Sequence, residues 1–215
     1  MSQFSIQEKN QLLGAWAHGW TISRCTDAPI PLADSAYRIQ VDLPGHLERY
    51  ILPGNIPGTI QKLAREIDTP DTWLKICAPH SSIVGLLPER WHIKPPEYLM
   101  SKILSHTTVN MPETYSIALT VDGHAVTARV CNQEGKHAAT GRMAIHGTHA
   151  VFDQIVTEPA HRRRGLANAI MQSLSNHAVS KQAEQGVLVA TDEGRALYTT
   201  LGWLLASEMT AAVMV

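Results

Sequence analysis

One segment constrains the fold of this 215-residue chain more than any other. Phe152, Ile155 and Val156 have the character of a strand end, and Pro159 then interrupts the apolar run. The segment Arg162–Ala167 follows as Arg-Arg-Arg-Gly-Leu-Ala, and apolar residues then recur at the three- and four-residue spacing of a helix. The pattern predicts a strand, a loop and a helix N-terminus, as expected in a chain that mixes strands and helices.

The start of this predicted helix is suited to binding an anion. The first backbone N–H groups of a helix lack intrahelical partners and lie at its positive end. Gly165 has no side chain that could hold an anion away from the backbone. Three consecutive arginines add forked donors that match phosphate oxygens. The residues therefore predict a pyrophosphate cradle made of Arg162, Arg163, Arg164, Gly165, Leu166, Ala167 and Asn168.

Two motifs resemble those of a known family. The spacing of Arg162, Gly165 and Ala167 resembles motif A of the GNAT superfamily of acyl-CoA-dependent N-acyltransferases, written Gln/Arg-x-x-Gly-x-Gly/Ala. The segment Gly194–Trp203 resembles a later motif, in which a helix carries Leu-Tyr and ends at Leu-Gly-Phe or Leu-Gly-Trp. The resemblance covers about residues 113–215. It implies an α/β fold (α+β, with a mixed sheet) of the GNAT type for that region.

The second half of the chain shows the alternation of strands and helices that such a fold needs. Asp122-Gly123 is a hairpin turn signal between two stretches with strand periodicity. We expect Gly186 to end the long motif helix and to start a buried strand. The expected strands are 115–121, 125–131, 138–145, 149–157, 187–190, 203–207 and 210–215, and the expected helices are 163–180 and 193–201.

The first half carries weaker signals. The expected helices are 6–18 and 57–67, and the expected strands are 21–24, 37–41, 50–52 and 73–77. Consecutive prolines in Lys94–Glu97 mark a junction, which predicts an N-terminal lobe over 1–97 and the acetyltransferase domain over 98–215. We interpret the lobe as a degenerate GNAT-like unit that shapes access of the acceptor. Its tryptophans are typical of a core; the alternative is an apolar acceptor pocket.

Composition limits the class of protein. The chain is 44% apolar and 17% charged with a formal net charge of -1, which indicates a globular protein and argues against a general nucleic-acid binder. We find neither a secretory leader pattern nor an apolar run long enough to cross a membrane. Cys25, Cys77 and Cys131 are far apart, which favours reduced thiols in the cytoplasm. The histidines lack metal-ligand spacing, so no metal is expected.

The GNAT resemblance also implies roles for single residues. The backbone of Ile155, Val156 and Thr157 would pair with the pantetheine amides, and Thr191 would touch the cofactor. Tyr198 matches the family tyrosine that acts as general acid, since a phenol is protonated at neutral pH. For the base we favour Asp153 over its neighbour Gln154, which cannot accept a proton; a chain of waters is the alternative.

The predicted function is acetyl transfer from acetyl-CoA to the primary amine of an acceptor, by direct attack in a ternary complex. No cysteine lies at a motif position, which argues against a covalent acyl-enzyme. The acceptor is expected to be a small-molecule amine, an amino acid or a peptide, and neither nucleic acid nor membrane is an expected partner. A homodimer is a further expectation. The alternative function is a catalytically lapsed CoA-binding regulatory or scaffold protein.

Overall fold

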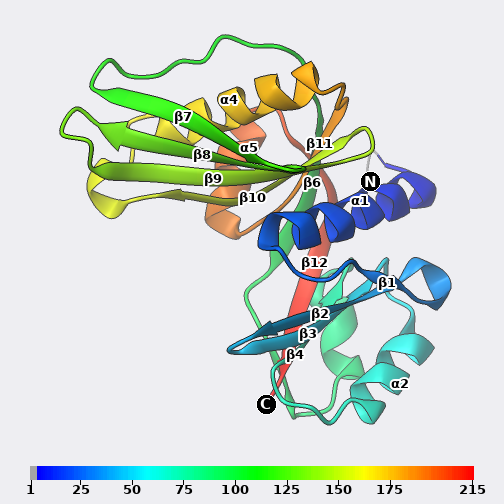
Figure 1. The fold of residues 1–215 in the computed structure, drawn as a ribbon. Helices are drawn as coiled ribbons and strands as arrows, with labels where there is room; N and C mark the ends of the chain where they lie inside the picture. Colours follow the sequence, from blue (N-terminus) through cyan, green and yellow to red (C-terminus); the bar gives the residue numbers. More distant parts are fainter. Residues whose placement is uncertain (1–3) are drawn as a thin grey trace.

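The computed structural model describes residues 4–215 and places strands from both halves of the chain in one mixed sheet (Figure 1). The strand order is β1-β2-β3-β4-β12-β6-β11-β10-β9-β8-β7, and β5 pairs with β12 beside this path. The strands are β1 (Ile30–Pro31), β2 (Tyr37–Leu43), β3 (His46–Leu52), β4 (Thr72–Ile76), β5 (Trp91–Ile93), β6 (Glu97–Ile103), β7 (Tyr115–Asp122), β8 (Ala125–Asn132), β9 (His137–His146), β10 (His149–Thr157), β11 (Gln185–Ala190) and β12 (Leu204–Met214).

Helices cover both faces of this sheet. The α-helices are α1 (Ile6–Arg24), α2 (Pro57–Glu66), α3 (His80–Ile83), α4 (Leu166–Ser180) and α5 (Asp192–Thr200), with short 3-10 turns at Ala33–Ser35, Val84–Leu86 and Pro159–His161. The expected mixed α/β class is confirmed, and most of the expected elements are present to within a few residues. Within residues 4–215, no helix is both long and apolar enough to cross a membrane.

The first helix is longer than expected, and the strand expected over 21–24 is wrong. A capping box between Ser5 and Glu8 starts α1, and Cys25 ends it in the left-handed conformation at φ 56°. Continuing as a helix buries Thr21 and Ser23, and the Thr21 hydroxyl donates to the His18 carbonyl one turn earlier. Burial on the sheet therefore outweighs the β propensity of this short stretch.

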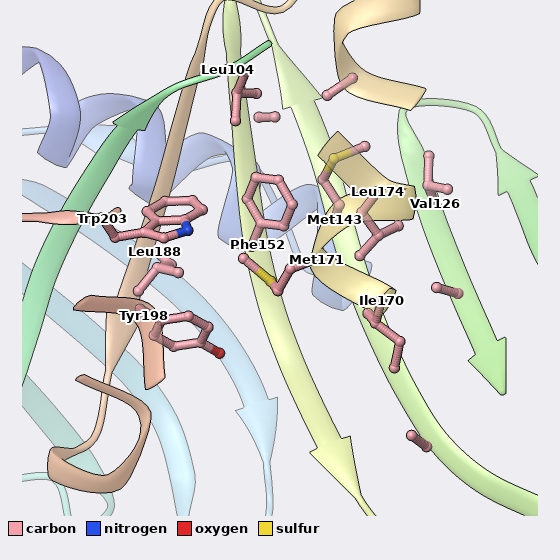
Figure 2. Packing of buried hydrophobic residues seen from close by; sticks show 14 of the residues in the cluster. Leu104, Val126, Met143, Phe152, Ile170, Met171, Leu174, Leu188, Tyr198 and Trp203 are labelled. Carbon is pink, nitrogen blue, oxygen red and sulfur yellow. The ribbon is translucent and has the colours of Figure 1, made fainter. Parts of the chain in front are cut away.

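α1 and α4 lie on opposite faces of the sheet (Figure 1). Successive residues of β10 point to opposite sides, so Val151 packs in the cluster with α1 while Phe152 packs in the cluster with α4. Figure 2 shows Phe152 beside Met171 of α4. A Cβ at Gly19 would lie 2.3 Å from the Val151 side chain, so α1 approaches β10 more closely than any other residue would permit.

The C-terminal strand joins the two halves of the chain. Residues 204–209 of β12 pair with β6, and residues 210–214 pair with β4 and β5. The two strands expected over 203–207 and 210–215 are thus one strand with a register shift between Leu205 and Ser207. The proline junction lies directly before β6, which starts at Glu97 and lies between β12 and β11 in the sheet.

Two further boundaries differ from expectation. α4 starts at Leu166 rather than at 163, because Arg163 and Gly165 adopt left-handed φ values of 60° and 78°. The helix ends at Ser180, and the chain reverses through Gln182, which also has a left-handed φ. Gly186 therefore lies inside β11 and does not end the helix.

Candidate active site

The fourth and fifth strands of the second half, β10 and β11, pair over only part of their length. Their parallel pairing runs from His149 with Gln185 to Phe152 with Leu188 and extends no further. β11 continues to Ala190 and stays paired with β6, while β10 continues to Thr157 and stays paired with β9. The two strands therefore separate beyond Phe152, and the β10 edge facing β11 is left without a strand partner there.

A β-bulge produces this separation. The register of β10 against β9 shifts between Asp153 and Val156, and Gln154 has a left-handed φ of 52°. Ile155 packs against the α4 side of the sheet, whereas the Val156 side chain is half exposed. The backbone of the expected pantetheine-binding segment, Ile155, Val156 and Thr157, thus lies at the free edge of a splayed strand.

The N-terminus of α4 follows the free edge and retains its unpaired donors. The first helical hydrogen bond of this turn runs from the Ala169 amide to the Gly165 carbonyl, and no side chain caps the helix. The amides of Leu166, Ala167 and Asn168 therefore precede the first intrahelical bond. Gly165 itself is exposed, and a Cβ there would meet no atom within 4 Å. This open turn can accept an anion against its backbone.

The three arginines before α4 differ in what they contact. Arg164 donates to the Tyr115 hydroxyl at 2.9 Å and to the Ala160 carbonyl at 3.3 Å, so it braces the loop. Arg162 makes a long contact of 3.4 Å to the Thr157 carbonyl, and Arg163 is exposed. Within residues 4–215 none of the three forms an ion pair, so their charge is free to act on a ligand.

Tyr198 is held on α5, which starts beside the splayed strands. Thr191 caps this helix by accepting from the Gly194 amide at 3.2 Å, and the Tyr98 hydroxyl donates to Asp192 at 2.6 Å. Tyr198 is 8% exposed and packs beside Trp203, and Figure 2 shows its hydroxyl pointing away from the Trp203 ring. Its hydroxyl forms no hydrogen bond within the described chain.

The environment of Tyr198 keeps its phenol protonated. Burial, and after it the negative charge of Asp153, raise the pKa of Tyr198 to about 12. A phenol with this pKa is almost fully protonated at neutral pH and can donate a proton. Tyr198 and Phe152, the residue directly before Asp153, both pack against the Trp203 ring, so the two expected catalytic residues lie on neighbouring parts of the fold.

The Asp153 carboxylate is bound by two side chains of the first half of the chain. Arg24 donates from Nε to Oδ2 at 2.5 Å and from its terminal nitrogen to Oδ1 at 3.1 Å, and Ser23 donates to Oδ2 at 3.0 Å. Both partners come from the end of α1. Neither partner was predicted, because Ser23 and Arg24 were expected to form a separate strand. No local signal connects Arg24 to Asp153, which lies 129 positions later in the chain.

A group of charged side chains extends from Asp153 into the first half of the chain. We call it the charge cluster; its members are Arg24, His46, Arg49, Lys75, Glu97 and Asp153. Electrostatic effects between them connect the whole group, and the Trp20 ring packs against Arg24, His46 and Arg49. No sequence motif singled out its first-half members.

Within residues 4–215, no three His, Cys, Asp or Glu side chains are grouped so that they could hold a metal ion. The cysteines are free thiols, and burial raises the pKa of Cys77 to about 12, which keeps that thiol protonated.

Comparison with known proteins agrees with this geometry. Residues 124–203 match the family model described as an acetyltransferase (GNAT) domain, while no curated protein matches the chain. A solved GCN5-related N-acetyltransferase from Kribbella flavida has a TM-score of 0.67 at 13% identity and covers 96% of this chain and 95% of its own.

Two further solved structures share the fold. A GCN5-related N-acetyltransferase from Sphaerobacter thermophilus has a TM-score of 0.62 at 12% identity, over 83% of this chain and 76% of its own. A GCN5-related N-acetyltransferase-like protein from Streptococcus suis has a TM-score of 0.60 at 14% identity, over 98% of this chain and 100% of its own. Residues 124–203 are therefore similar to GNAT acetyltransferase domains, and the chain has the fold of the solved GCN5-related N-acetyltransferases.

Proposed function

We propose that this protein is an N-acetyltransferase that transfers an acetyl group from acetyl-CoA to the primary amine of an acceptor, by direct attack in a ternary complex. The observation that carries the proposal is the separation of β10 from β11 beside Tyr198. It supplies, in one place, a free strand edge and a protonated phenol. The uncapped N-terminus of α4 follows directly in the chain.

The residues suit the pyrophosphate and the pantetheine arm of acetyl-CoA. The amides of Leu166 to Asn168, with Arg162 and Arg163, would hold the pyrophosphate, since helix N-termini and unpaired guanidinium groups favour anions. The free edge of β10 over Ile155–Thr157 would pair with the pantetheine amides. When bound, acetyl-CoA would supply the thioester carbonyl and a thiolate leaving group.

Tyr198 would serve as the general acid. As the carbon–sulfur bond breaks, its hydroxyl donates a proton to the sulfur, which a phenol held protonated by burial can do. The attacking nitrogen gives up one proton as its bond to the carbonyl carbon forms. The phenolate recovers one proton in the same turnover, so the protons balance without a net gain or loss by the protein.

Asp153 would receive the proton that leaves the amine, directly or through water. Its three donors from Arg24 and Ser23 fix the carboxylate in one orientation and leave one lone-pair position on Oδ1. Its negative charge also favours the positive charge that develops on the attacking nitrogen. Arg24 therefore acts as a positioning residue for Asp153. The Thr191 side chain caps α5, and its contact with the cofactor stays a prediction.

The decisive experiment measures thiol release from acetyl-CoA by the full chain against a panel of amines, amino acids and peptides. The proposal expects at least one acceptor to give release that is matched by acetylated product. If calorimetry detects CoA binding but no acceptor gives thiol release, the alternative is favoured, which is a catalytically lapsed CoA-binding regulatory or scaffold protein. The protonated Tyr198 beside Asp153 favours the enzyme.

A further inference from the structure

The charge cluster holds more positive than negative charge. Lys75 pairs with Glu97 at 2.6 Å, and Arg24 pairs with Asp153. His46 accepts from Nε of Arg49 at 3.2 Å, which fixes its Nε2 as an unprotonated acceptor. Burial, together with Arg49, Lys75 and Arg24, lowers the pKa of His46 to about 3, so this ring is neutral. Each carboxylate thus already has its own cation, and Arg49 is left over.

Arg49 is buried without an ion-pair partner of its own in residues 4–215, although the charges of Glu97 and Asp153 act on it. The residue is 7% exposed, and its guanidinium forms no ion pair within residues 4–215. Its carbon lies 4.1 Å from the centroid of the Trp20 ring, and Trp16 also lies beside it. Burial lowers the pKa of Arg49 to about 10, which reflects the cost of keeping this charge out of water. A buried cation of this kind normally has an anionic partner.

The position of Arg49 relates it to the reaction centre. Arg49 lies on β3, and the charges that act on it include Asp153 of β10. Asp153 in turn acts on Tyr198. Arg49 and Arg24 pack against the same Trp20 ring, with guanidinium carbons 4.1 Å and 5.3 Å from its centroid, and Arg24 is the cation paired with Asp153. The Arg49 guanidinium therefore lies near the expected amine-binding carboxylate. This is where the remainder of an acceptor would extend from its amine.

We propose that Arg49 binds a carboxylate of the acceptor, so that the acceptor is an amino acid in which amine and carboxylate belong to one molecule. This inference rests on the proposed function. The planar guanidinium suits a two-point contact with a carboxylate, and the tryptophan face holds it in a fixed orientation. The carboxylate takes no part in bond making: the amine nitrogen joins the carbonyl carbon, sulfur leaves with one proton, and the product is an N-acetyl amino acid.

The first test uses the unaltered full-length protein. Common α-amino acids and their carboxamides, which differ in the carboxylate and in the pKa of the amine, are compared as acceptors by thiol release, with rates expressed per concentration of neutral amine. The inference expects the acids to have kcat/KM about 10- to 100-fold above their amides, the range for a hydrogen bond to a charged group in a buried site. Equal rates for acids and amides would overturn it while leaving the proposed function intact.

Variants locate the effect at Arg49. Arg49→Met keeps the length of the side chain and its contact with the tryptophans but removes the charge, and Arg49→Lys keeps the charge without the fork. The ratio of acid to amide should fall to near one in Arg49→Met and stay intermediate in Arg49→Lys. Arg65→Met, at an exposed position on α2, is the matched control and should keep the wild-type ratio. A purely structural Arg49 would lower the rates for acid and amide alike.

A binding measurement separates failure of the inference from failure of the proposed function. The melting temperature of the wild type is recorded with N-acetyl amino acids and with their amides, which need no turnover. Stabilisation by the acids alone, lost in Arg49→Met, would support the carboxylate site even if no amine were acetylated. Equal shifts for acids and amides in the folded wild type would reject it.

Discussion

Unpaired arginines occur in two regions of this molecule under opposite conditions. Before α4, Arg162 and Arg163 are exposed and lie next to a helix N-terminus. On β3, Arg49 is buried against the Trp20 ring. Salt and water screen the exposed pair, whereas the buried guanidinium acts through a medium of low polarity.

The two halves of the chain therefore suit different kinds of ligand. The second half uses backbone groups and exposed charge, which suits a long, flexible and highly charged ligand. The first half contributes single buried side chains, which suits discrimination among small acceptors. Variants and fragments can show whether the two regions depend on each other for stability and whether each binds its own ligand.

The largest effect is expected when the first half is removed. A fragment of residues 98–215 loses α1, which covers β10 on one face, and also loses β4 and β5, which pair with β12. Exposed apolar surface costs about 25 cal/mol per Å², so we expect the fragment to aggregate or to melt far below the full chain. A soluble fragment with the parent's melting temperature and CoA affinity would show that the halves are independent.

Breaking the exposed region should remove CoA binding without unfolding the chain. Gly165→Glu places a carboxylate against the phosphates at the start of α4, so calorimetry should detect no CoA binding by the folded variant. The left-handed φ of 78° adds strain of its own. Gly165→Asn is the matched control: asparagine tolerates that conformation and adds bulk without charge, so it should weaken CoA binding less than Gly165→Glu. Unchanged affinity in folded Gly165→Glu would disprove the cradle.

The difference between the regions also explains what the sequence could predict. The strand, loop and helix around Gly165 are contiguous, so local periodicity and a glycine were sufficient to place them. The bulge in β10 lies within a strand whose bounds were predicted at 149–157, but its left-handed Gln154 has no sequence signature. Local signals were therefore sufficient for the strand, loop and helix, but not for the bulge at which β10 leaves β11.

The sequence could not predict which residues the first half contributes to the candidate site, and the reason is physical. Arg24 and Asp153 meet across 129 positions, and only the packing of α1 on β10 brings them together. Similarly, Arg49 acquires its significance from Trp20 and from carboxylates on other strands. Such contacts depend on tertiary structure, and neither propensity nor spacing along the chain encodes them.

Replacing Tyr198 should lower turnover without changing the affinity for CoA. Tyr198→Phe removes the hydroxyl and keeps the ring beside Trp203, so kcat should fall on the order of 10²-fold with CoA affinity nearly unchanged. With a pKa of about 12, the phenol in the wild type should not deprotonate below about pH 11. Wild-type turnover in the variant would leave Tyr198 as a packing residue.

A smaller effect should appear in the pH dependence of stability. The pKa of His46 is about 3 in the folded chain and about 6.5 when unfolded, so only the unfolded chain takes up this proton between those values. The free energy of unfolding should therefore fall as the pH drops from 7.5 to 5.5.

Urea denaturation of His46→Gln tests this effect. The variant should lose less stability over the same pH range than the wild type, by up to about 1 kcal/mol after allowance for solvent screening. His92→Gln, at an exposed position on β5, is the control and should follow the wild type. Parallel pH profiles for wild type and His46→Gln would show that the charge cluster does not keep His46 neutral.

The most direct test of the central claim is initial-rate kinetics with both substrates varied. If the second half holds acetyl-CoA while the first half holds the acceptor, both must be bound before transfer, and double-reciprocal plots should intersect. Parallel lines, or an acetylated protein trapped in the absence of acceptor, would indicate a covalent intermediate. Either result would contradict direct attack in a ternary complex.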